Sequence, residues 1–349
     1  MHRLPVLARG TIGWRVAAAV VVSWVVPMAL ALGAPAVPGE LPFRDDLDAH
    51  VRALIALPLL IAVEPYVEGK LVGSVLAFLK RGIIPKSQRL RFLRIVAGAE
   101  RMRTHWVAML PLLLLAVALA VIQPTIARTS AWGRWYGLVS LSAFRFVLLR
   151  WYYWLSIWYA TLWRISRLDL RLNPLHSDGC AGLGFLSASL RGLAPVLVAQ
   201  AIVVAGGLAH RVQLGASPQT FSAEVAGVVF GLVAMAVLPL TFFCLHLGRA
   251  RSKGAGQYGE MSMRYVDEFR SKWIYGNHSP TETLVGTPDL QSLADLHSGY
   301  DVVTSIKLLP ASIGQMLRLA AFVLLPFVPL TLTTVPIDEL AGRILKQLL

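Results

Sequence analysis

A carboxylate followed by a proline interrupts one of the most apolar stretches of this chain. Glu64 and Pro65 lie inside LPLLIAVEPYVEGKL, residues 57–71. A charged carboxylate in hydrocarbon costs about 3 kcal/mol on insertion scales, so such groups are usually paired or functional. Pro65 removes a backbone donor and predicts a bent helix, and Glu68 follows one turn later on the same face. A bent helix that carries an acid at mid-depth is typical of transporters and channels.

Two arginines later in the chain are candidate partners for these carboxylates. Arg145 and Arg150 lie in the apolar segment 135–163. Pairing with Glu64 would offset the burial of both charges, although Arg150 could instead extend to the membrane surface. In one interpretation the pair only holds helices together. In the other, Glu64 couples or conducts ions, and the arginines are its counter-charges or select an anion.

The loop NPLHSDGCAGLGF, residues 173–185, is the most motif-like segment outside the apolar runs. His176, Asp178 and Cys180 alternate in it, and all three side chains can bind a transition metal. Three ligands within five residues form a cramped set, and no second cluster supplies the remaining ligands. Asp178 followed by Gly179 is typical of a tight turn. We therefore predict a turn here, with no bound metal and no cofactor.

Aromatic side chains are concentrated in the segment that carries the two arginines. Rings with a polar tip gather at the headgroup level of membranes without any ligand, so this run predicts an interfacial belt. The alternative is a flat aromatic wall for a quinone, a pigment or a lipid tail. The residues concerned are Trp151, Tyr152, Tyr153, Trp154, Trp158, Tyr159 and Trp163.

The elements that must position these residues follow from composition. The 349 residues are 56% hydrophobic and 15% charged, whereas soluble domains have about 45–50% apolar and about 25% charged residues. Apolar runs long enough to cross hydrocarbon recur along the chain, which predicts an all-α, polytopic transmembrane helix bundle of about seven spans. The predicted spans are residues 14–35, 51–79, 105–122, 135–163, 191–209, 223–247 and 315–334, the first six forming a membrane domain over 1–248.

The basic residues predict an orientation for this bundle. The loop between the second and third spans, residues 80–106, holds eight Lys or Arg and one Glu, which places it in the cytoplasm. Alternation then puts the N-terminus inside and the C-terminus outside. The net charge of +14 is assigned to such cytoplasmic loops and to anionic lipid, not to nucleic acid. The first apolar run is longer than the core of a signal peptide and is interpreted as a retained span.

Other segments form helices that do not cross the membrane. Residues 86–103 place Leu90 and Leu93 at helical spacing and surround them with basic residues, among them Lys86, Arg89, Arg91, Arg94 and Arg101. We therefore expect this segment to lie on anionic headgroups. Residues 249–310 predict a cytoplasmic amphipathic helical segment packed against the bundle. Residues 311–349 hold the last span and a short amphipathic tail. A homo-oligomer is compatible with these features.

Three stretches resemble a group of bacterial integral-membrane proteins. They are LDLRLNPLHSDGCAGLGFLS, VGTPDLQSLADLHSGYDVVTSIKLLP and LLPFVPLTLTTVPIDELAGRILKQLL. The group more often has a proline-aspartate pair and a doubled glycine in the first stretch, where this chain has Ser177 before Asp178, and Cys180 and Ala181 between glycines. The resemblance covers most of the chain. It implies a multi-pass protein of the bacterial cytoplasmic (inner) membrane, and it carries no activity.

Together these observations favour a transporter or channel for a small ion or solute. Glu64, with Glu68, Arg145 and Arg150 as further candidates, would form its site. The alternative is a membrane scaffold or signalling subunit that binds lipid or a cytosolic partner, with purely structural charges. A membrane enzyme acting on lipid ranks third, because the sequence has neither a His-Glu-x-x-His nor a Gly-x-Ser-x-Gly motif, and we predict no catalytic residue.

Overall fold

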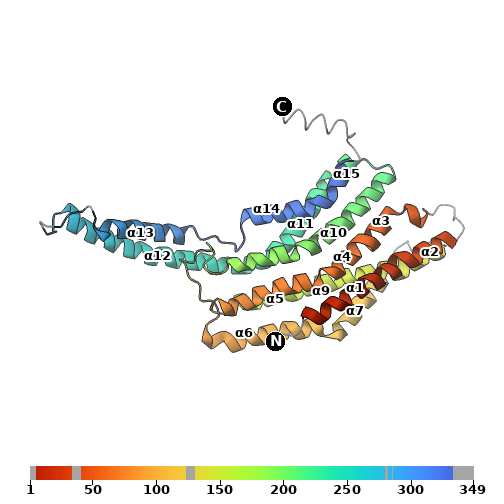
Figure 1. Ribbon diagram of the computed structural model, residues 1–349, viewed down its shortest axis with the longest axis horizontal. Coiled ribbons are helices and arrows are strands. Elements are labelled where there is room, and N and C mark those ends of the chain that lie inside the picture. Colours follow the sequence, from red (N-terminus) through yellow and green to blue (C-terminus); the bar gives the residue numbers. More distant parts are fainter. Residues whose placement is uncertain (1–4, 34–40, 123–129, 280–281, 285, 333–349) are drawn as a thin grey trace, which may run out of the picture.

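A computed structural model describes residues 5–33, 41–122, 130–279, 282–284 and 286–332. These residues form an all-α fold, as predicted (Figure 1). The α-helices are α1 (Pro5–Val20), α2 (Val26–Gly33), α3 (Leu47–His50), α4 (Leu57–Ala62), α5 (Glu64–Lys80), α6 (Arg89–Thr104), α7 (Met109–Ile122), α8 (Ala131–Trp135), α9 (Leu141–Ser166), α10 (Ala188–Gln213), α11 (Ser222–Val237), α12 (Cys244–Phe269), α13 (Pro288–Thr304), α14 (Ile313–Leu324) and α15 (Val328–Leu332).

Several of these helices are pieces of longer rods. A π-helical turn at Val21–Val25 joins α1 to α2, a second at Val51–Ala56 joins α3 to α4, and a third at Tyr136–Ser140 joins α8 to α9. Such turns insert a residue into the α-helical ladder and rotate the side chains that follow it. Each rod therefore continues past its π-helical turn with a shifted apolar face.

Among the residues that the structure describes, four helices are long and apolar enough to cross a membrane: Ile12–Gly33, Gly184–Gln213, Gln219–Ile274 and Ile313–Leu330. A fifth candidate is the pair Lys86–Thr104 and Trp106–Ile122, if the 56° bend between them lies within one span. The predicted spans 51–79 and 135–163 are helical, but neither forms a helix that is both long and apolar enough to be a candidate span. The first is interrupted at Val63, and the second contains arginines, tryptophans and tyrosines that lower its hydropathy. The described part of the chain thus holds four or five candidate spans, fewer than the predicted seven.

The core is built around α10. This helix packs against α4, α5, α11 and α14, while α9 packs against α6 and α7 on the other side of α4 and α5. Close approach is possible because α10 carries small residues where it meets its neighbours. A Cβ atom at Gly206 would lie 2.8 Å from a methyl group of Val51, so this position accepts only glycine without movement of the neighbouring rod.

The predicted boundary at residue 248 is not a break in the chain's path. The helix that begins at Gln219 continues to Ile274, over 56 residues, because a 3-10 segment at Leu238–Phe243 joins α11 to α12. Its length is about 80 Å at 1.5 Å per residue. Its second half pairs with α13 as a hairpin that extends along the longest axis of the molecule (Figure 1). At the base of this hairpin, Gly254 packs against Val303 and Pro174. The predicted tail and the end of the last predicted span, residues 333–349, lie outside the described residues.

Candidate functional site

Glu64 lies at a break between two helices. α4 ends at Ala62 and α5 begins at Glu64, with Val63 between them in a turn. Pro65 occupies the second position of α5, where its missing N–H and fixed φ are tolerated. The break predicted from the Glu-Pro pair is therefore present. Glu64, directly after it, is buried, with 8% of the residue exposed.

The carboxylate of Glu64 is shared by arginines from two other helices. Nη1 of Arg15, from α1, donates to Oε2 at 2.9 Å, and its Nη2 donates to Oε1 at 3.2 Å. Nη2 of Arg150, from α9, also pairs with Oε1. The side chain of Arg150 is largely buried, whereas that of Arg15 is 41% exposed. The cluster holds two positive charges and one negative charge, and it ties three helices together at the bend.

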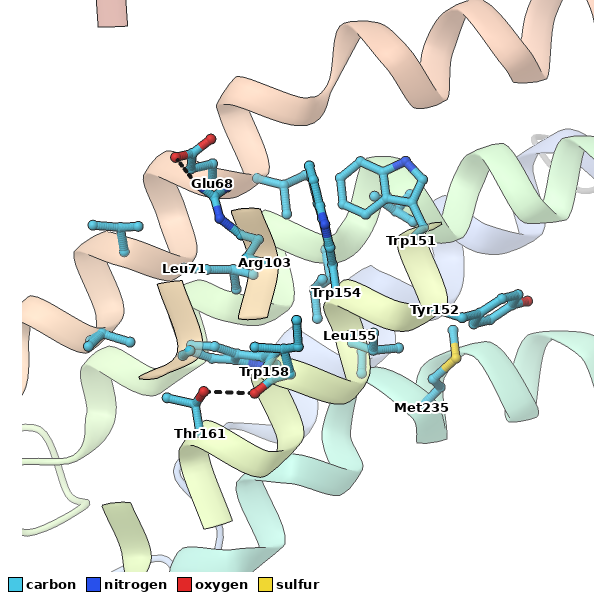
Figure 2. A pocket seen from close by; sticks show the side chains of 18 of the residues that line it. Glu68, Leu71, Arg103, Trp151, Tyr152, Trp154, Leu155, Trp158, Thr161 and Met235 are labelled. Atoms are coloured by element: carbon cyan, nitrogen blue, oxygen red, sulfur yellow. Dashed lines mark hydrogen bonds and ion pairs between the residues drawn. The ribbon is translucent and has the colours of Figure 1, made fainter. Parts of the chain in front are cut away.

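Glu68 belongs to a second cluster one turn further along α5. Its Oε1 accepts a hydrogen bond from Nη2 of Arg103 at 2.8 Å, and the same guanidinium contacts Glu100 at 3.2 Å. Arg103 and Glu100 both belong to α6. The ring of Trp154 links the two clusters. Its centroid lies 4.7 Å from the Arg150 guanidinium carbon and 5.5 Å from that of Arg103, within range for cation–π attraction. Figure 2 shows Glu68, Arg103 and Trp154 side by side.

The other predicted partner, Arg145, lies elsewhere. It precedes Arg150 by five residues, which is about 140° around a helix, so the two side chains leave α9 on different faces. Arg145 lies beside Arg52 and Tyr136, toward the α3–α4 end of the bundle. Sequence reasoning missed Arg15 altogether. The available signal was an arginine only three residues inside the apolar run that begins at Ile12.

No family model, curated protein or solved structure matches this chain. The family resemblance suggested by the sequence is therefore not supported by these comparisons, and the site must be interpreted from its own geometry.

The tryptophans of α9 form part of the interior. Trp151 and Trp158 are 4% and 5% exposed and belong to the main hydrophobic core. The Trp151 indole N–H donates to the Leu60 carbonyl at 3.1 Å, one turn before the break at Val63. Together with Trp154 they line an apolar cavity of about 150 Å³ between α5, α6 and α9 (Figure 2). These three residues therefore form an aromatic wall around a cavity, as in the alternative to the predicted interfacial belt, while Trp163 is exposed.

The loop at residues 173–185 is organised by one carboxylate. Asp178 accepts backbone N–H groups from Cys180 at 2.9 Å, Gly182 at 3.0 Å and Gly184 at 2.9 Å. His176 lies 3.1 Å from the same carboxylate. Burial raises the pKa of Asp178, but the three backbone donors outweigh burial, so the pKa lies below its usual value. Among the described residues no group of three or more His, Cys, Asp or Glu is placed to hold a metal ion.

This geometry predicts that Asp178→Ala opens the loop. Removing the carboxylate leaves three N–H groups without an acceptor, at a cost of about 2–4 kcal/mol. Cys180, which is 4% exposed, should then react with a maleimide at least about tenfold faster at pH 7, because each 1.4 kcal/mol changes an opening equilibrium tenfold. The measurement uses detergent-purified protein carrying Cys244→Ser. The exposed Asp267 provides a matched control, and Asp267→Ala should leave the labelling rate unchanged.

Acid and metal ions give two further outcomes for the same loop. Because the pKa of Asp178 is lowered by folding, its contribution to stability is present at neutral pH and is lost as the pH falls through the lowered pKa. Proteolysis of the loop by an acid-active protease should therefore increase below about pH 4 in the wild type, and not in Asp178→Ala.

Zn²⁺ should not selectively protect Cys180 from labelling in the wild type. Protection that requires Asp178 and His176 would restore the metal interpretation.

Proposed function

We propose that the protein is an integral membrane protein that moves a small ion or solute, with Glu64 as the coupling carboxylate. The observation that carries this proposal is the buried carboxylate at a helix break, shared by arginines from α1 and α9. Arg15 is the half-exposed partner, so it is the one that can leave. A proton or cation that replaces Arg15 on Glu64 would free α1 from the bend, and charge would then be linked to helix position.

The depth of the cluster supports this role. Glu64 lies 13 residues after Val51, which is about 20 Å along the rod, and Arg15 lies three residues after the start of the candidate span at Ile12, or about 5 Å. With the N-terminus in the cytoplasm, both positions fall in the inner half of a hydrocarbon layer about 30 Å thick. The membrane we propose is the bacterial cytoplasmic membrane, where the exposed basic face of α6 would lie on anionic headgroups.

A second candidate is a membrane scaffold or signalling subunit. It is favoured by the α12–α13 hairpin, which extends beyond the bundle and exposes large apolar side chains, among them Met261, Met263 and Tyr275. A cytosolic partner could bind to such a surface. In this role the Glu64 cluster is a static clamp, since both carboxylate oxygens are occupied.

Proton flux into proteoliposomes, followed with a trapped pH-sensitive dye, separates the two candidates. Wild type is expected to dissipate an imposed pH gradient faster than protein-free vesicles. The exchanged pair Glu64→Arg with Arg150→Glu retains an ion pair and should regain most of the thermal stability that either single change loses. It should not regain flux, because the carboxylate has moved to another helix. The scaffold is supported if wild-type vesicles show the same flux as protein-free vesicles. This comparison covers both polarities of membrane potential and gradients of Na⁺, K⁺ or Cl⁻.

A further inference from the structure

A separate groove lies on the other side of α10. It has a volume of about 530 Å³ and is lined by residues of α4, α5, α10 and α14. Its walls are apolar, and Leu59, Ala194, Val198, Leu319 and Phe322 supply much of them. Neither Glu64 nor Glu68 lines this groove. It is therefore distinct from the site proposed above and from the tryptophan-lined cavity.

Two arginines stand at one end of the groove. Arg191, on α10, and Arg318, on α14, both line it and are exposed. The Nε of Arg318 donates to the Gly314 carbonyl of its own helix at 3.1 Å. Neither arginine forms an ion pair with any residue that the structure describes, in contrast to Arg15, Arg103 and Arg150. Lys70 adds a third cation, with its Nζ 5.5 Å from the centroid of the Tyr66 ring, which also lines the groove.

The two arginines stand at the same level along their helices. Near the starts of α10 and α14, Gln315 Nε2 donates to Ser187 Oγ at 3.2 Å, which fixes the relative height of the two helices. Arg191 follows Ser187 by four residues and Arg318 follows Gln315 by three, so each lies about 5–6 Å further along. Both helices are candidate spans that begin at this end. In a membrane this level corresponds to the headgroups, where arginine meets lipid phosphate.

The apolar part of the groove continues in the direction of the hydrocarbon. Ala194 and Val198 follow Arg191 by one and two turns on α10, and Phe322 follows Arg318 by one turn on α14. An apolar channel that deepens away from a cationic end is complementary to a molecule with one anionic end and a hydrocarbon chain. A soluble anion would leave the apolar walls uncovered, and an uncharged lipid would leave the arginines without a counter-charge.

We infer that this groove binds an anionic phospholipid of the leaflet at the α10 and α14 starts, with its phosphate on Arg191 and Arg318 and one acyl chain along Ala194, Val198 and Phe322. The lipid supplies the negative charge that the described protein residues do not supply at this end of the groove. It also occupies the space between α14 and the helices α4 and α5, which no side chain of the described residues fills. The inference does not depend on transport through the Glu64 cluster.

The test measures lipid binding to the full chain, purified in detergent, by native mass spectrometry during titration with phosphatidylglycerol or phosphatidylcholine. Wild type should bind its first phosphatidylglycerol at least about tenfold more tightly than phosphatidylcholine, since each arginine near a headgroup contributes to the preference. Arg191→Gln with Arg318→Gln should remove most of this preference, and the remainder is expected from Lys70 and the basic face of α6. Arg191→Lys with Arg318→Lys should retain a large part of it, which shows that the loss follows from charge and not from misfolding.

Two controls identify the site. Arg251→Gln with Lys253→Gln removes the same charge from exposed positions of α12 and should leave the preference within about twofold of wild type, because those cations lie outside the groove. Val198→Trp fills the groove and should weaken the binding of both lipids, with the arginines intact. Equal affinity of wild type for the two lipids, an equal loss in the α12 control, or full displacement of phosphatidylglycerol by glycerol phosphate would each overturn the inference.

Discussion

Glu64→Gln should destabilise the protein by about 3–5 kcal/mol, the cost of removing one partner from a buried ion pair. The substitution preserves shape and takes away the charge that two guanidinium groups share. Arg150, whose side chain is 16% exposed, is then left without its carboxylate in the interior. The free energy of unfolding, measured by denaturant titration of the protein in micelles and followed by tryptophan fluorescence, gives the effect directly.

Glu68 provides the matched control for this change. It is on the same helix, one turn away, has the same chemistry and is paired with one arginine at a similar distance. Its side chain is 42% exposed, however, and an ion pair at that exposure contributes about 0.2–1 kcal/mol. Glu68→Gln should therefore cost less than about 1 kcal/mol. Equal costs for the two substitutions would contradict the view that Glu64 clamps three helices.

A double variant tests whether the stability lost in Glu64→Gln comes from the unpaired charge of Arg150. Combining Glu64→Gln with Arg150→Met removes both buried charges, and buried pairs can often be replaced by apolar groups at little net cost. Arg15 is half-exposed and can turn away from the cluster. The double variant should therefore recover most of the stability lost in Glu64→Gln. Recovery of stability without recovery of proton flux is the combination that the transport proposal requires.

The sequence predicted local features of the site better than its long-range contacts. The bend at Glu64 and Pro65 follows from proline chemistry within one helical turn, and the turn at Asp178 follows from the hydrogen-bonding habits of aspartate and glycine. The pairing of Glu64 with Arg15 joins residues 49 positions apart. No periodicity specifies such a contact, because it depends on how α1 lies across the α4–α5 rod.

The span predictions show a related limit. Hydropathy identifies helices that are apolar along their whole length, whether they are mostly exposed, as Ile12–Gly33 is, or mostly buried, as Gly184–Gln213 is. α9 lies between other helices and carries the arginines and aromatic rings that the interior uses, so its mean hydropathy falls although it is long and many of its residues are buried. The predicted span 51–79 is missed for a different reason, the interruption at Val63. The same residue types, Trp and Arg, are expected at a membrane surface. Composition alone therefore cannot distinguish an interior helix of this kind from an interfacial one.

Trp151→Ala tests which of these two environments α9 provides. A buried tryptophan replaced by alanine costs about 3–5 kcal/mol in soluble proteins. In a membrane the unfolded helix stays in an apolar surrounding, which reduces the transfer contribution and leaves the lost packing and the new cavity. We therefore expect about 3 kcal/mol, the low end of that range. Trp151 already lines a cavity of about 150 Å³, so the substitution enlarges an existing void and does not allow neighbours to close it.

The hydrogen bond and the packing of Trp151 can be measured separately. Trp151→Phe retains most of the ring but leaves the Leu60 carbonyl, next to the break at Val63, without its donor, at about 1–3 kcal/mol. Trp163, on the same helix, is 46% exposed, and Trp163→Ala should cost less than about 1 kcal/mol. An interior α9 predicts the order Trp151→Ala, Trp151→Phe, Trp163→Ala, from largest to smallest loss in the same denaturant titration. An aromatic belt predicts similar small losses at residues 151 and 163, because rings at the headgroup level contact lipid and water at both positions.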